Sequence, residues 1–393
     1  MRIPIAILLG FLFSCQSPKE PLYQLETRSL PANRSHGLPY LEKGLDGVLR
    51  CSWVETSGDT AILKYASWEE ANWSEAEEIA RGTNWFVNWA DYPKISSSDQ
   101  VMIAHYLQKS SPDTYAYDVM AKVKDTYGWG TPFKVHDDTS QTEHGFVSMA
   151  ALPGDRFWLV WLDGRNTSQA HQGAMTLRSG IVNAHGQVSE ATELDNRVCD
   201  CCATTITVAK GVPIAAYRDR SNTEIRDISL TRLTEEGWTS PTPVKRDNWE
   251  IAGCPVNGPS MDAYGNTVAV GWFTGSQNKP SVQLAFSRDK GTTFDEAILI
   301  DDQQPAGRVA VKMLDEQTAA LLWLAKSGDS GQIRLRIVNV HGTTIQDLPI
   351  AFTSEARASG FPQLEVDGDF LYMANTQVGD DVMKVSTHRM RFR

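Results

Sequence analysis

Hydrophobic residues recur in short runs that are spaced almost evenly along the chain, and most of these runs end in an aromatic residue. Successive runs end 53, 55, 56, 55, 51 and 51 residues apart. A period this regular predicts one repeat architecture, rather than the two or three separate domains that a length of 393 residues suggests. The runs end at Trp53, Tyr106, Trp161, Tyr217, Trp272, Trp323 and Ala374.

Each run lies inside a unit of four strand-like segments. A stretch of small residues precedes the run, an alternating polar and apolar segment follows it, and a fourth segment opens with an aromatic or apolar residue. Alternation with a period of two, with turn residues between the segments, predicts four antiparallel strands. Four-stranded sheets repeated around an axis make a β-propeller, whose closed ring protects the strand edges.

The number of segments predicts how the ring closes. The sequence contains seven sets of the first three strands but six fourth strands. Residues 22–30 alternate well and are expected to supply the missing strand. The predicted fold class is therefore all-β, a propeller of seven four-stranded blades closed by an N-terminal strand. Six blades is the alternative if a terminal unit is degenerate.

The first residues resemble an export signal. Arg2 precedes an apolar segment, residues 3–13, which is too short to span a bilayer of about 30 Å. Residues 12–15 resemble the lipobox of bacterial lipoproteins, in which Cys15 takes the lipid. The alternative is an ordinary signal peptide with an incidental cysteine. We expect a signal peptide at 1–14, a tether at 15–21 and a single propeller domain at 22–393.

Gln16 after the lipobox cysteine favours the outer membrane of the bacterial cell envelope, with the lipid anchor as the membrane contact. The net charge of the chain limits the classes of partner that it can bind. Asp and Glu number 48 against 37 Lys and Arg, which gives a net charge of −11. Nucleic-acid binding needs a basic face, so this balance argues against it. We expect a monomer that binds a glycan or another small ligand.

One face of the predicted ring collects the unusual residues. In a propeller, the loops from each fourth strand to the next first strand open on the same face as the loops between second and third strands. Function commonly lies on such loops. Long loops are expected there at residues 81–91, 136–144, 195–202, 246–256, 301–306 and 354–359.

Residues 287–294, with the sequence SRDKGTTF, resemble the Asp box of the BNR-repeat, sialidase-like propellers. Trp73, Trp129 and Trp238 mark eroded copies. The resemblance covers the chain after the signal peptide and implies a glycan-binding propeller. In the active enzymes of the family, an arginine triad clamps the substrate carboxylate, an Asp is the acid/base, and a Tyr–Glu pair is the nucleophile. Guanidinium groups suit carboxylates because they bind them in a bidentate way.

The matching candidates lie on the expected functional face. The family's R-I-P motif occurs in this chain at residues 2–4, inside the signal, so whether the chain is an exo-glycosidase of sialidase type or a non-catalytic propeller stays open. A different interpretation is open for some of these residues. Surface ion pairs would explain Arg218, Asp219 and Arg220, and local packing would explain Trp85. The candidates are Asp163 or Asp219 as acid/base, Tyr217 with Glu224 as nucleophile, Arg165, Arg218, Arg220, Arg308 and Arg357 as substrate-binding residues, and Trp85 as a sugar-stacking residue.

The cysteines of the chain form a second cluster of candidate functional residues, separate from the arginines. Cys51 lies in a predicted strand and is expected to be buried. Two successive loops on adjacent blades carry the other four, namely Cys199, Cys201, Cys202 and Cys254. In an oxidising compartment these favour disulfides. The alternatives are a redox role, or a soft-metal site for copper or zinc with His144 or His136 as a nitrogen ligand. A non-enzymatic propeller that binds metal or a protein through these cysteines is the alternative function.

Overall fold

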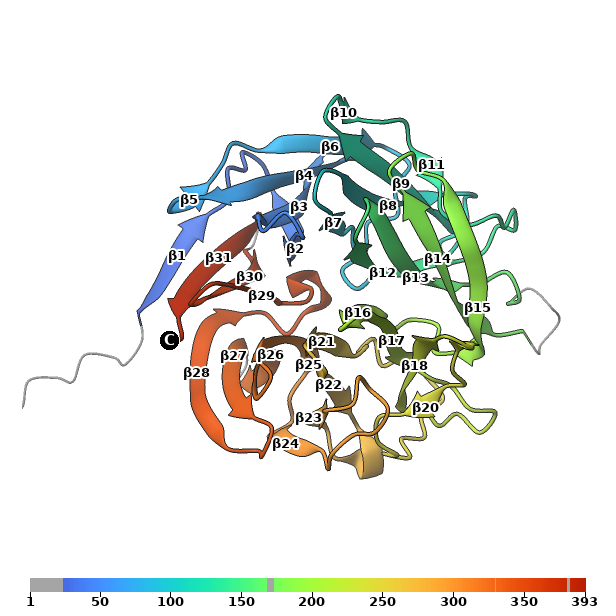
Figure 1. Cartoon of the computed structure of the whole chain (residues 1–393). Helices are drawn as coiled ribbons and strands as arrows, with labels where there is room; N and C mark the ends of the chain where they lie inside the picture. The colour runs from blue at the N-terminus through green and yellow to red at the C-terminus, as the bar shows by residue number, and fades with distance from the viewer. Residues whose placement is uncertain (1–23, 168–172, 329, 380–381) are drawn as a thin grey trace, which may run out of the picture.

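Seven antiparallel sheets stand around a common axis in the computed structural model, which describes residues 24–167, 173–328, 330–379 and 382–393 (Figure 1). Each sheet is one blade, and in six blades the strands follow the chain from the axis outward, whereas the seventh takes its outermost strand from the N-terminal segment. The seven-bladed all-β prediction is confirmed, and the six-bladed alternative is excluded. The expected signal peptide, tether and lipid-anchor residue Cys15 lie outside the described residues.

The first four blades contain the following strands. Blade 1 is β2 (His36–Lys43), β3 (Leu49–Ser57), β4 (Thr60–Glu69), β5 (Asn72–Trp73) and β6 (Glu77–Gly82), and blade 2 is β7 (Ile95–Ser97), β8 (Met102–Lys109), β9 (Tyr117–Asp125), β10 (Gly128–Trp129) and β11 (Phe133–Lys134). Blade 3 is β12 (His144–Leu152), β13 (Arg156–Asp163), β14 (Met175–Asn183) and β15 (Val188–Val198), and blade 4 is β16 (Thr205–Ala209), β17 (Val212–Arg218), β18 (Ile228–Thr234), β19 (Gly237–Trp238) and β20 (Thr242–Pro243).

The remaining blades complete the ring. Blade 5 is β21 (Ser260–Tyr264), β22 (Thr267–Thr274), β23 (Ser281–Ser287) and β24 (Ile298–Asp301), and blade 6 is β25 (Gly307–Asp315), β26 (Thr318–Ser327), β27 (Ser330–Asn339) and β28 (Thr344–Thr353). Blade 7 is β29 (Gln363–Asp367), β30 (Phe370–Val378), β31 (Met383–Arg391) and β1 (Leu25–Ser29). Two short 3-10 helices, η1 (Ser276–Asn278) and η2 (Arg357–Ser359), lie in loops. Among the described residues, none of the helices has the length and apolar character needed to cross a membrane.

The N-terminal strand closes the ring, as predicted. Strand β1 pairs antiparallel with β31 in a register that runs from Leu25 opposite Met390 to Ser29 opposite Ser386 (Figure 1). The predicted span of 22–30 is therefore longer than the strand itself. Blades 1, 2 and 4 differ from the prediction in another way, because their fourth strands are broken into two pieces. In blades 2 and 4, Pro132 and Pro241 lie in the breaks, where a residue without an N–H cannot continue the ladder.

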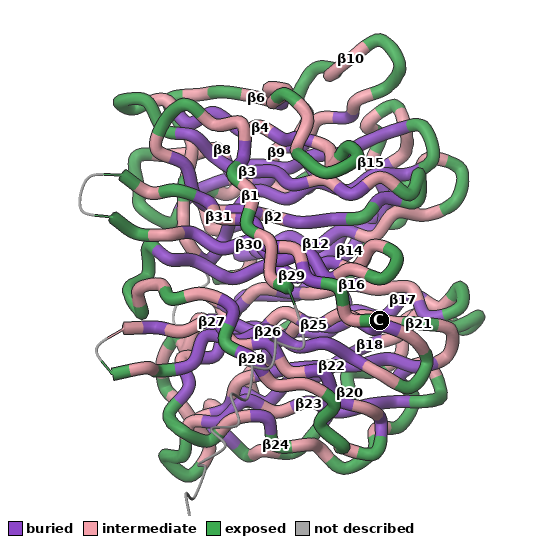
Figure 2. The backbone as a smooth tube through the Cα atoms, turned by 90° about the vertical axis from the view of Figure 1, so that its left-hand side faces the viewer, coloured by how far each residue is buried: buried purple, intermediate pink, exposed green. Residues whose placement is uncertain are grey.

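The periodic aromatic residues are the core of the blades. Figure 2 shows buried segments through the middle of the strands and exposed segments at the turns. In five blades, the aromatic side chain of the second strand is at most 1% exposed and donates its N–H or O–H to a carboxylate. Buried aromatic residues with a polar group need such a partner. The pairs are Trp53 with Glu55 (3.3 Å), Trp161 with Asp163 (3.0 Å), Tyr217 with Asp195 (2.5 Å), Trp272 with Asp247 (2.7 Å) and Trp323 with Asp301 (2.6 Å).

Candidate functional site

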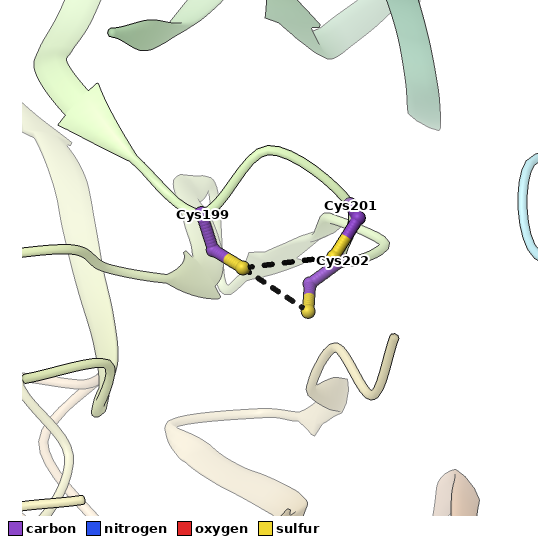
Figure 3. Close-up of side chains that lie close together, drawn as sticks. All are labelled: Cys199, Cys201 and Cys202. Atoms are coloured by element: carbon purple, nitrogen blue, oxygen red, sulfur yellow. Dashed lines mark hydrogen bonds between the residues drawn. The ribbon is translucent and has the colours of Figure 1, made fainter. Parts of the chain in front are cut away.

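Three thiols meet in the short loop between β15 and β16. The Sγ atom of Cys199 lies 3.5 Å from that of Cys202 and 4.0 Å from that of Cys201 (Figure 3). Cys199 and Cys202 are each 1% exposed, and all three residues are free thiols. The predicted clustering of these cysteines is present, and their separations exceed the roughly 2.05 Å of a disulfide bond.

The neighbouring blade holds this loop in place. The backbone N–H of Cys199 donates to the carbonyl of Arg218 at 3.0 Å, at the end of β17. The Asp200 carboxylate accepts from the Arg220 guanidinium at 3.1 Å. A tight turn at residues 200–201 then returns the chain, so that Cys202 faces the same point as Cys199. The loop is therefore fixed at both sides of the three thiols.

The fourth thiol approaches from the next loop, as predicted. Cys254 is exposed, and the Cys201 thiol donates to it, which lowers the pKa of Cys254 to about 7. The Cys254 thiolate is thus well populated at neutral pH, whereas an ordinary free cysteine is mainly protonated. This adds an accessible thiol at the edge of a buried group of three.

Hydrogen bonds and positive charge favour a thiolate at Cys199. Contacts with the thiols of Cys201 and Cys202 lower the pKa of Cys199, and Arg226 Nη1 donates to the Cys199 sulfur at 3.2 Å. Arg226 is itself 3% exposed and is held by the Glu224 carboxylate at 2.7 Å. Burial raises the pKa of Cys202 in the same cluster. The group therefore contains one strongly favoured thiolate and protons that a metal ion can displace.

The arginines predicted to bind a substrate carboxylate are mostly engaged inside the protein. Arg218 is 2% exposed and donates to the carbonyls of Asn257, Arg226 and Phe273 at 2.6–2.9 Å. Arg308 is 6% exposed and donates to carbonyls of the loop before β29, including Gly360 at 3.0 Å. These guanidinium groups satisfy backbone oxygens of the loops.

Carboxylates occupy two of the other arginines. Arg165 binds Asp163 through Nε at 2.8 Å and Nη2 at 2.9 Å. Arg220 binds Glu224 at 2.8 Å and also contacts Asp200. Arg357 lies exposed in η2. The structure therefore places Arg165 and Arg220 in loops, Arg218 and Arg308 at the ends of β17 and β25, and Arg357 in η2, and it holds four of the five in internal contacts.

The catalytic candidates also have structural partners. Tyr217 donates to Asp195 and Glu224 accepts from arginines, so the structure does not bring Tyr217 and Glu224 together as a nucleophile pair. Burial alone would raise the pKa of Asp163, but the Arg165 guanidinium lowers it to about 2. Asp163 therefore stays ionised and is a poor proton donor at neutral pH. Burial raises the pKa of Asp219 to about 6, which leaves it as the carboxylate among these candidates that can exchange a proton near neutrality.

Trp85 has the packing role that was the alternative to sugar stacking. Its ring stacks on Tyr106 with the centroids 4.3 Å apart and the planes 18° from parallel. Tyr106 is the periodic aromatic residue of blade 2, so Trp85 covers the core of this blade. An offset aromatic stack of this kind stabilises the local fold.

His144 does not join the thiols. It begins β12, where its Nδ1 faces the carbonyl oxygens of Tyr117 and Thr142 at 3.3 and 3.2 Å. The ring belongs instead to a separate group with His136 and three aspartates, Asp118, Asp138 and Asp163. Sequence reasoning missed these contacts because Asp118 and Asp163 are distant from the histidines in the chain and the group has no motif spacing.

A central cavity of about 510 Å³ follows the axis of the ring. The first strands of the blades line it with both charged and aromatic side chains. Lys312 binds Glu365 at 2.7 Å, and the Lys94 ammonium lies 5.5 Å from the centre of the Tyr92 ring. Pockets with a few directed polar groups are typical of small-ligand sites.

No protein-family model and no curated protein sequence matches the chain. Solved structures to which it is similar include the subtype N10 neuraminidase-like protein of A/little yellow-shouldered bat/Guatemala, with 12% identity, a TM-score of 0.49 and coverage of 94% of this chain and 97% of that one. Another is the NanB sialidase of Streptococcus pneumoniae, with 8% identity, a TM-score of 0.49 and coverage of 93% and 94%. The polysaccharide lyase Uly1 has 9% identity, a TM-score of 0.49 and coverage of 96% and 93%.

Proposed function

We propose that this propeller binds one soft metal ion, Cu(I), through the thiolates of Cys199, Cys201 and Cys202. The observation that carries the proposal is the convergence of these three sulfurs within 4.8 Å of one another. Three sulfurs at about 2.3 Å from one ion in a trigonal plane lie about 4.0 Å apart. The measured separations of 3.5 and 4.0 Å are close to this value.

The donor set favours Cu(I). Thiolates select soft ions such as Cu(I), and they also bind Zn(II), which in structural sites takes four ligands. Three of the sulfurs converge, while Cys254 lies beside Cys201 at the exposed edge. Arg226 balances part of the negative charge that three thiolates and a monovalent ion carry together. Cys254 is then placed to exchange the ion with a partner or with solvent.

Metal titration tests the proposal. Reduced, metal-free protein is titrated anaerobically with Cu(I) against a chromophoric competitor, and X-ray absorption measures the Cu–S coordination. One Cu(I) per chain with three sulfur ligands is expected. Preferential binding of Zn(II), or four thiols that are oxidised in the native protein and fail to bind Cu(I) after reduction, contradicts the proposal. Cys51→Ala is the matched control, because Cys51 is a fully buried thiol in β3 and belongs to the blade core.

Glycan binding is a second candidate function, favoured by the central cavity. Its hydroxyl, ammonium and carboxylate groups next to Tyr40 and Tyr92 offer hydrogen bonds and aromatic surface to a sugar. A panel of acidic oligosaccharides tests binding, and fluorogenic glycosides test turnover. Lys94→Met is expected to weaken glycan binding, whereas Lys384→Met on the exposed edge of β31 is not. Absence of binding across the panel removes this candidate.

Attachment to the bacterial outer membrane through Cys15 is also proposed, on the strength of the lipobox-like residues 12–15. Metabolic labelling with a radioactive fatty acid, followed by membrane fractionation, tests it. The wild-type chain is expected in the outer-membrane fraction with label. The Cys15→Ser variant is expected without label, and equal labelling of both chains contradicts the proposal.

A further inference from the structure

A second cluster of metal-ligating side chains lies between blades 2 and 3. Asp138, His144 and Asp163 bring three ligand atoms within 4.8 Å of one another. His136 lies next to them, with its ring parallel to that of His144 at 3.9 Å and 7°. This cluster offers nitrogen and oxygen atoms as ligands, in contrast to the sulfur atoms of the loop 199–202.

The environment of His144 requires a positive species between its ring and the carboxylates. Its Nδ1 faces two backbone carbonyl oxygens, which accept hydrogen bonds, so this nitrogen carries a proton. Its Nε2 then faces Asp138 Oδ2 at 3.0 Å and Asp163 Oδ1 at 3.6 Å. An unprotonated Nε2 against two carboxylates is repulsive unless a proton or a metal ion lies between them. An Nδ1–H that donates to the backbone, with Nε2 left for the ion, is the usual arrangement of a metal-binding histidine.

His136 provides an independent observation beside this cluster. Its side chain has no exposed surface, and neither ring nitrogen makes a hydrogen bond among the described residues, although Nε2 lies 3.4 Å from Asp118 Oδ1. A buried imidazole without partners is costly. Within the described part of the chain, His136 therefore adds a buried imidazole without a hydrogen bond beside this group.

The surrounding charge and access fit a cation. The carboxylates of Asp118, Asp137, Asp138 and Asp163 surround the two imidazoles, and the nearby cations are Lys134, Arg165 and Arg178. Carboxylates thus outnumber cationic groups. A cleft of about 430 Å³, lined by His136, Trp161 and Arg165 among others, adjoins this group.

We infer that His144, Asp138 and Asp163 bind a divalent transition-metal ion of the Zn(II) class, with His136 beside the site. An imidazole with carboxylates suits such borderline ions, whereas Cu(I) prefers the thiols. The site is separate from the proposed Cu(I) site. A test that contradicts the Cu(I) proposal therefore does not contradict this inference.

Co(II) binding tests the inference, because the spectrum identifies the ligands. A nitrogen and oxygen site gives d–d bands without the sulfur-to-cobalt charge-transfer absorption of a thiolate site. Wild-type protein is expected to bind one Co(II) in this way, and Zn(II) is expected to displace it. Asp138→Asn is expected to weaken binding about 100-fold and His136→Ala at least tenfold. His341→Ala, in an exposed turn, is the matched control and is expected to bind as the wild type does.

Folding of the variants is checked by circular dichroism and by the unfolding temperature without metal. Asp138 lies at the edge of the cluster and Asn keeps its shape, so Asp138→Asn remains informative even if His136→Ala does not fold. A Co(II) spectrum that contains only thiolate bands overturns the inference. Unchanged Co(II) affinity in folded Asp138→Asn overturns it as well.

Discussion

The thiol loop 199–202 and the buried arginines Arg218 and Arg308, at the last residue of β17 and near the start of β25, differ in the state of their polar groups. The guanidinium groups donate to several backbone carbonyls each and have little capacity left for a ligand. The thiols contact mainly one another, and their lone pairs converge on one point. The difference teaches that the type of residue on a functional face matters less than whether its hydrogen bonds are already satisfied.

The largest expected effect is on metal affinity. Cys199→Ser is expected to weaken Cu(I) binding by about 100-fold or more, because it removes the thiolate that Arg226 stabilises. Serine has nearly the same shape, so the unfolding temperature of the metal-free protein is expected to change little. Competition titration measures the affinity. If the affinity of Cys199→Ser equals that of Cys51→Ala, the thiol loop is not the binding site.

A buried arginine is expected to behave in the opposite way. Arg308→Met leaves the carbonyls of Glu355, Ala356 and Gly360 without their donor and is expected to cost about 3 kcal/mol of unfolding free energy. Its Cu(I) affinity is expected to match the wild type. Denaturant unfolding provides the measurement, and Arg357→Ala, exposed in η2, is the control with a change within about 0.5 kcal/mol. A stable Arg308→Met variant would remove the distinction between the two regions.

Arg226 connects the two kinds of residue, because it is a buried arginine that donates to a thiolate. Arg226→Gln is expected to lower the Cu(I) affinity about tenfold, as changes in residues that hold a metal ligand commonly do. The affinity is measured at pH 7 and at pH 9. Because the guanidinium favours the Cys199 thiolate, the deficit of the variant is expected to shrink at the higher pH. A deficit that is equal at both pH values argues for a purely structural role.

The smallest expected effect concerns the exposed thiol. With a pKa of about 7, the Cys254 thiolate fraction rises about threefold between pH 6.5 and 7.5. The rate of iodoacetamide alkylation at Cys254 in metal-free protein is expected to rise by the same factor, as followed by peptide mass spectrometry. Cys51 is fully buried and its pKa is raised, so it is expected to stay unmodified. A midpoint above pH 8 at Cys254 shows that Cys201 does not donate to it.

Sequence periodicity predicted the ring, since a strand pattern and a fixed spacing follow directly from which side chains are buried. The aromatic ends of the second strands, the closing strand and the neighbourhood of the two cysteine loops all follow from that pattern. It could not predict that Tyr217 and Asp163 belong to the hydrogen bonds that repeat from blade to blade, because their partners depend on three-dimensional contacts. For the same reason, the contacts of His136 and the internal partners of the arginines could not be predicted, because a position near the end of a strand or in a loop does not say which groups a side chain contacts.

The pairing of β1 with β31 has a consequence for the topology of the chain. The two ends of the propeller lie side by side in blade 7, so a short linker can join them without disturbing any blade. New ends can then be opened at a tight exposed hairpin, such as the turn between β3 and β4. A chain permuted in this way keeps all seven sheets but builds blade 7 from one continuous segment. The position of the chain ends and the architecture of the ring are therefore separable properties of this molecule.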